Sequence, residues 1–165
     1  SKMVLPEHTF YVDNIFAYSP LPYMKTIYYI PEIFYIYFIG REDQSVTVEN
    51  IVNRYKQQIV VFKHLFDSYS YDEIMKMEKG LKNYMLHALN TMTMVTLMFT
   101  CGKNTKERKE DTKELWKYCK KKDIKLYKWL RHRGYSILVN HLPFWLKGKI
   151  MMFGYKNEVR HHDVG

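Results

Sequence analysis

Apolar residues follow two different patterns along the chain, and the change comes early in the sequence. Residues 26–30 (TIYYI) and 33–39 (IFYIYFI) are uncharged runs of β-branched and aromatic residues, which is typical of strands buried on both faces. Pro31 and Glu32 separate the runs as a turn would. We therefore predict a short β-hairpin near the N-terminus, followed by a polar loop at residues 40–45 (GREDQS).

Helical periodicity begins after this loop. Thr47 suits an N-cap, and apolar residues then recur at spacings of three and four, so we predict a helix that ends near Tyr69. A Ser-x-x-Glu capping box at residues 70–73 predicts the start of a second helix that continues to about Phe99. The expected buried stripe of the first helix consists of Ile51, Tyr55, Ile59, Phe62 and Phe66.

The C-terminal half of the second helix, residues 85–101, is largely apolar and lacks Asp, Glu, Lys and Arg. Its length is at the short limit of a membrane-spanning helix, which needs roughly 17–25 residues. The run also contains Asn90 and four threonines. On length and polar content we favour a buried core helix over a membrane span, with Gly102 at its C-cap.

Two more helices and an aromatic tail are expected beyond this point. A cap at Asn104 predicts a basic helix to about Lys121, and Asp123 could cap a short helix that ends at Arg133. Residues 135–153 are apolar and aromatic, with interspersed lysines. The fold class predicted from these patterns is mainly α with a short β-hairpin. The apolar side of the basic helix should carry Leu115, Trp116 and Cys119.

Positive charge is concentrated in one stretch. Residues 102–133 contain 13 basic and 5 acidic residues and so carry +8 of the net charge of +9. Such a patch suits an anionic partner, either nucleic acid or lipid headgroups, although a solvated lysine-rich helix face explains the same pattern. Cys101 and Cys119 form no disulfide framework, and no signal peptide is visible, so we expect a reduced, cytoplasmic protein.

The sequence contains no glycine-rich phosphate loop and no DxD-type pair of acids for a metal. Residues 161–163 (HHD) could bind a metal weakly, but a frayed polar tail is the simpler interpretation. Asp13 stands out as a lone acid in an aromatic and apolar segment. It is either a helix cap or, because apolar surroundings raise the pKa of a carboxyl group, a general base. Composition alone favours the cap.

A second polar cluster follows the predicted strands. Arg41 lies close to Gln44 and Ser45, and its guanidinium could hold a phosphate or carboxylate in bidentate fashion. The alternative is a loop arginine that pairs with Glu42 or Asp43.

Several short segments of mixed aromatic and polar residues match a known family: residues 5–14 (LPEHTFYVDN), 20–23, 28–29, 35–46 (YIYFIGREDQSV) and 54–59 (RYKQQI), and more weakly 113–116 and 154–156. They closely resemble bacterial family 2 glycosyltransferases of the type that builds cell-surface polysaccharide. The resemblance spans most of the chain. Residues 39–46 are its most specific part, and the later helices are generic.

The resemblance implies the C-terminal portion of a GT-A type enzyme. Residues 1–46 would be the tail end of the catalytic domain, and residues 47–165 a helical C-terminal region. Asp13 matches the base that deprotonates an acceptor hydroxyl, which then displaces a nucleoside diphosphate with inversion, helped by a divalent metal (Mg²⁺ or Mn²⁺). Arg41, Gln44 and Ser45 would lie near the donor diphosphate or the acceptor.

The chain departs from the family in lacking the nucleotide-binding region and the DxD motif. The resemblance therefore implies a fragment that binds neither the metal nor the nucleotide-sugar donor and is inactive alone. Its partners would be that donor and a glycan or lipid-linked acceptor in the parent enzyme.

Other functions stay open. A membrane-surface module would lay residues 102–165 on anionic lipid, which would place the enzyme peripherally on the inner face of the membrane. A non-catalytic protein-interaction module is a further alternative, and the exposed edge of the hairpin could pair two copies into a homodimer. Nucleic-acid binding ranks last because no known motif matches, although basic residues interleave with Trp116, Tyr118, Tyr127 and Trp129.

Overall fold

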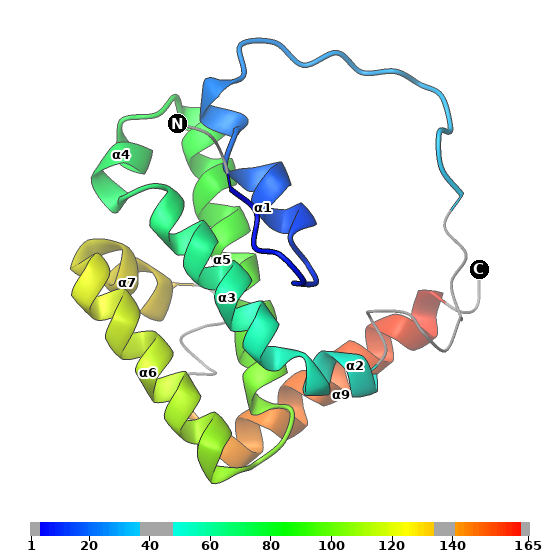
Figure 1. Ribbon diagram of the computed structural model, residues 1–165, viewed down its shortest axis with the longest axis vertical. Helices are drawn as coiled ribbons and strands as arrows, with labels where there is room; N and C mark the ends of the chain where they lie inside the picture. Colours follow the sequence, from blue (N-terminus) through cyan, green and yellow to red (C-terminus); the bar gives the residue numbers. More distant parts are fainter. Residues whose placement is uncertain (1–3, 37–47, 134–140, 163–165) are drawn as a thin grey trace.

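The structure is a computed structural model that describes residues 4–36, 48–133 and 141–162, and within these ranges its regular elements are helices. The longest helix, α5, runs through the middle of the molecule, and the other helices pack around it (Figure 1). The mainly α prediction is confirmed. The elements are α1 (Asp13–Tyr18), the 3₁₀ helix η1 (Leu21–Tyr23), α2 (Val48–Asn53), α3 (Tyr55–Ser68), α4 (Tyr71–Met75), α5 (Lys79–Cys101), α6 (Lys106–Lys122), α7 (Ile124–Arg131) and α9 (Phe144–His162).

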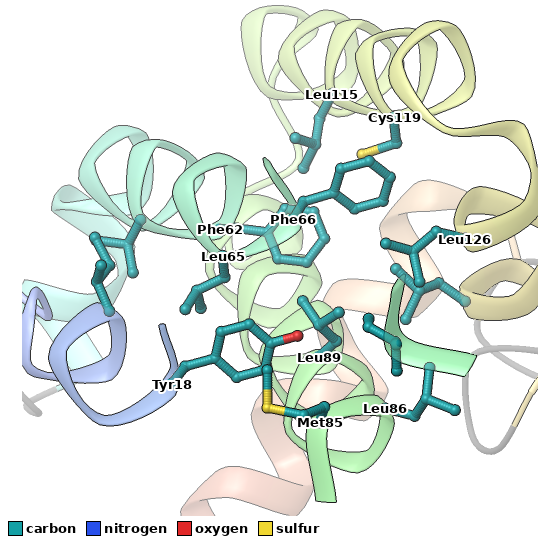
Figure 2. Packing of buried hydrophobic residues seen from close by; sticks show 14 residues of the cluster. Tyr18, Phe62, Leu65, Phe66, Met85, Leu86, Leu89, Leu115, Cys119 and Leu126 are labelled. Carbon is teal, nitrogen blue, oxygen red and sulfur yellow. The ribbon is translucent and has the colours of Figure 1, made fainter. Parts of the chain in front are cut away.

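The main core lies where α1, α3, α5, α6 and α7 meet (Figure 2). The stripe predicted for the first helix faces this core or a smaller cluster beside it, with Ile59 partly buried and its other members buried. The helix itself is interrupted. Arg54 has φ −96° and ψ 15° and divides the predicted element into α2 and α3. Residues at the centre of the core in Figure 2 are Phe62, Phe66, Leu89, Leu115 and Cys119.

The prediction of a buried core helix is confirmed for α5. Its threonine hydroxyls bond to carbonyls of the preceding turn, as in Thr93 Oγ1 to Leu89 O at 2.7 Å and Thr96 Oγ1 to Met92 O at 2.7 Å. This local pairing satisfies polar groups that would be costly to bury alone. Across the described residues, no helix combines the length and apolar character that crossing a membrane requires.

Side-chain caps explain where several helices begin. The capping box at Ser70 and Glu73 is confirmed, but its helix α4 ends at Met75 and α5 starts separately at Lys79, so the single long helix was wrong. α6 is capped by Thr105, not Asn104.

Asp123 caps α7, as predicted, and also joins α7 to α4. One carboxylate oxygen accepts from Lys125 N and Leu126 N, each at 2.9 Å. The other accepts from Tyr71 N at 2.7 Å. One side chain therefore satisfies the first amides of two helices, which fixes the direction in which both leave the core.

The predicted hairpin is wrong for the part of it that the structure describes. Residues 24–36 form no strand there and run as a long extended segment away from the helices (Figure 1). Their apolar side chains are exposed: Tyr28 is 88% and Ile33 is 87% accessible. The residue types favour strands, but a strand is stable only beside a partner, and the described residues place none next to this segment.

The last helix packs against the end of α5 through a glycine. A Cβ atom on Gly148 would lie 2.0 Å from the carbonyl oxygen of Cys101, so only glycine permits this approach. Cys101 and Cys119 are both buried free thiols.

Candidate functional site

The motif at residues 11–14 (YVDN) stands where the N-terminal segment enters α1. Asn14 fixes the turn, because its side-chain Nδ2 donates to the carbonyl of Tyr11 at 3.1 Å and its backbone N donates to the same oxygen at 3.2 Å. Tyr11 has φ 68°, a left-handed conformation that costs a non-glycine residue of order 1–3 kcal/mol. Contacts elsewhere must offset this strain.

The Tyr11 ring provides one such contact. It packs edge-on against Phe99 near the end of α5, with ring centroids 5.3 Å apart. Burial raises the pKa of the Tyr11 hydroxyl, and the charge of Arg54 and its hydrogen bond oppose that shift. The motif is therefore held on the helical body rather than carried on a free loop.

A second anchor lies one residue earlier. The backbone N–H of Phe10 donates to Oε1 of Gln57 at 3.0 Å. The guanidinium carbon of Arg54 lies 3.7 Å from the centroid of the Phe10 ring. Nη1 of Arg54 is buried and has no hydrogen-bond partner among the described residues. The junction between α2 and α3 thus holds the segment that leads into the motif.

Arg108 of α6 bonds to residues next to both contacts, that of Tyr11 with Phe99 and that of Phe10 with Arg54. Its side chain is only 5% exposed, Nη1 donates to the carbonyl of Phe99 at 2.7 Å, and Nη2 donates to the carbonyl of Val52. Its guanidinium lies 3.9 Å from the Tyr55 ring, whose hydroxyl donates to Asp111 at 2.7 Å. Burial lowers the pKa of Arg108, while the neighbouring acids oppose that shift.

Asp13 is the first residue of α1 and is exposed. The cap interpretation is wrong, because the N-cap is Val12 and α1 has no side-chain cap hydrogen bond. An acid in the first turn still interacts favourably with the helix dipole. The carboxylate Oδ1 lies 3.5 Å from Nδ2 of Asn14. Asp13 is therefore accessible to a ligand, while its backbone is fixed by the residues on either side.

Arg41, Gln44 and Ser45, the other predicted site residues, lie outside the residues that the structure describes. Sequence reasoning missed Arg54, Gln57 and Arg108 as supports of the motif. For the first two, a signal was present, since both belong to the segment 54–59 that shares the family resemblance. Arg108 gave no signal, because it lies in a helix full of exposed basic residues.

Comparisons with protein-family models, with curated proteins and with solved structures found no match to this chain. The described residues contain no group of three or more His, Cys, Asp or Glu side chains that could hold a metal ion.

Proposed function

We propose that this chain is the acceptor-activating portion of an inverting, GT-A type family 2 glycosyltransferase, with Asp13 as the general base. The reaction moves a sugar from a nucleoside diphosphate to an acceptor hydroxyl in surface polysaccharide synthesis. Asp13 takes the hydroxyl proton, the acceptor oxygen bonds to the anomeric carbon, and the nucleoside diphosphate leaves from the opposite face.

The observation that carries the proposal is the combination of exposure and fixation at Asp13. A general base must reach the proton it removes and must stay within hydrogen-bond distance of it. The Asp13 carboxylate is exposed, whereas its backbone is held by the Asn14 turn and by the packing of Tyr11 on Phe99. An acid with no role beyond solvation on the surface would require neither the strained backbone at Tyr11 nor the packing of the Tyr11 ring on Phe99.

The test compares Asp13→Asn with Glu7→Gln in the product of the complete reading frame that contains residues 1–165. Sugar transfer is measured as nucleoside diphosphate release from a panel of nucleotide sugars, with membranes of the source organism as acceptor. Losing a general base lowers kcat by about 10²–10⁴-fold. We expect this loss in Asp13→Asn and a change below twofold in Glu7→Gln, which removes another exposed acid of the same segment.

Thermal unfolding separates a chemical effect from a structural one. Because Asp13 is exposed and caps nothing, we expect both variants to unfold at nearly the same temperature as the wild type. Equal kcat for Asp13→Asn and the wild type, or no transfer from any nucleotide sugar, would count against the proposal.

A second proposed role, compatible with the first, is contact with a membrane surface through α9. α9 exposes Trp145, Lys149, Ile150 and Phe153, and the Lys149 Nζ lies 5.5 Å from the centroid of the Trp145 ring. Aromatic and aliphatic side chains beside lysine suit a helix that lies in the headgroup region of anionic lipid.

Flotation with phosphatidylglycerol-containing vesicles tests this role, and pure phosphatidylcholine vesicles report the charge dependence. We expect Trp145→Ala/Phe153→Ala to lose flotation. Tyr28→Ala/Phe34→Ala, which removes two exposed aromatic rings elsewhere, should retain it. Equal flotation of the two double variants would remove α9 as the contact.

A further inference from the structure

A hollow of about 710 Å³ lies on a different part of the molecule from Asp13. Three helices line it. α4 contributes Tyr71 and Met75, α7 contributes Trp129, with Arg133 just beyond the end of that helix, and α5 contributes one of its sides. Figure 1 shows α4 and α7 on the same side of α5. The α5 face consists of Lys82, Asn83, Tyr84, Leu86, His87 and Asn90.

The charge of this groove is one-sided. Lys82 and Arg133 line it, and none of its described lining residues is acidic. The nearby acids of α4 are engaged elsewhere: Asp72 pairs with Lys125 at 2.7 Å, and Glu73 belongs to the capping box. Cations without a lining acid favour an anionic ligand.

The uncharged lining indicates what else the ligand carries. Trp129 and Tyr84 offer aromatic faces, and Tyr84 is 53% exposed. The guanidinium of Arg133 lies 5.4 Å from the centroid of the Trp129 ring, so a cation and an aromatic surface are adjacent. Asn83 lines the same groove, and its side-chain amide can supply the donor and acceptor that hydroxyl groups need.

We propose that this groove binds a phosphorylated saccharide. Arg133 and Lys82 hold the phosphate, an aromatic ring covers the apolar face of the sugar, and the side-chain amide of Asn83 bonds to a sugar hydroxyl. Free sugar phosphates and sugars linked to a lipid diphosphate share this chemistry. A role as a holding site for the acceptor rests on the proposed function above, whereas the binding itself does not depend on Asp13.

The test titrates the 165-residue chain with N-acetylglucosamine 1-phosphate and follows amide chemical shifts by NMR. Uncharged N-acetylglucosamine, inorganic phosphate and UMP are the matched ligands, and a farnesyl-diphosphate-linked N-acetylglucosamine distinguishes the lipid-linked source from the free one. The variants are Lys82→Ala/Arg133→Ala and Tyr84→Ala. Lys120→Ala/Lys121→Ala is the control, because it removes the same charge from exposed positions of α6.

We expect the amide chemical shifts of the groove residues to change on addition of the sugar phosphate. The affinity for the sugar phosphate should be at least tenfold lower in Lys82→Ala/Arg133→Ala. In the control it should stay within twofold of the wild type. Tyr84→Ala should weaken the sugar phosphate more than inorganic phosphate. Equal affinity for inorganic phosphate and the sugar phosphate, tighter binding of UMP, or equal binding by the two double variants would each overturn the proposal. Because binding is read directly, it can fail while Asp13 proves catalytic, and the reverse also holds.

Discussion

Replacing Arg108 by methionine tests the arrangement that supports the candidate site. The change keeps a long apolar stem and removes the guanidinium, so the carbonyls of Phe99 and Val52 lose their donors. A buried acceptor left without a partner costs about 1–3 kcal/mol. The stacking of the guanidinium on Tyr55 is lost as well, at about 0.5–2 kcal/mol.

These losses are partly offset because the buried charge of Arg108 is no longer desolvated. We therefore expect the free energy of unfolding to fall by about 2–4 kcal/mol, out of a total of about 5–15 kcal/mol for an ordinary domain. With a urea m-value of about 2 kcal/mol/M, the unfolding midpoint should move down by about 1–2 M. Circular dichroism at the helical band measures this directly.

Lys113→Met is the matched control, since it makes a similar loss of charge at an exposed position of the same helix. It should change stability by less than about 0.5 kcal/mol. Arg108→Lys should recover only part of the loss, because one ammonium cannot reproduce the planar fork that reaches two carbonyls and stacks on a ring. A midpoint for Arg108→Met equal to that of Lys113→Met would refute the reasoning.

Two further predictions concern other parts of the fold. Gly148→Ala should destabilise the protein by about 1–3 kcal/mol, because its new methyl group meets the Cys101 carbonyl; Gly154→Ala in the same helix, where nothing lies within 4 Å, should be neutral or stabilising. Hydrogen bonds from Ser70 hold the pKa of Glu73 below its ordinary 4.5, so this group stabilises the fold above that pH and the effect is lost as pH falls through its lowered value. In urea unfolding, Glu73→Gln should have a lower free energy of unfolding than the wild type at pH 7 and an equal one in acid. The control Glu114→Gln should show no such trend. A difference between Glu73→Gln and the wild type that does not change with pH would contradict the predicted direction.

The sequence predicted correctly those features whose causes are local. The Ser70 capping box, the Asp123 cap and the burial of α5 all depend on residues within a few positions of one another. The helix interruptions at Arg54 and after Met75 were missed, since the apolar spacing continues across both and gives no sign of a break.

The predicted hairpin failed for the opposite reason. Residues 26–30 have the composition of a buried strand, but such a composition favours a strand only where a neighbouring strand can pair with it. In the described residues this segment has none, so its side chains are exposed. The same limit applies to Asp13, whose exposure on a fixed turn could not be read from its apolar neighbours in the sequence.

The contacts around residues 11–14 are linked to one another, and together they stabilise the strained backbone conformation of Tyr11. Phe10 and Tyr11 are adjacent in the chain, but the Phe10 ring lies against Arg54 at the junction of α2 and α3, whereas the Tyr11 ring lies against Phe99 of α5. Arg108 joins α5 to α2, since it donates to the carbonyl of Phe99 and to that of Val52, two residues before Arg54. Arg108 therefore braces the surroundings of the turn that carries the exposed Asp13 carboxylate, although it does not contact that carboxylate.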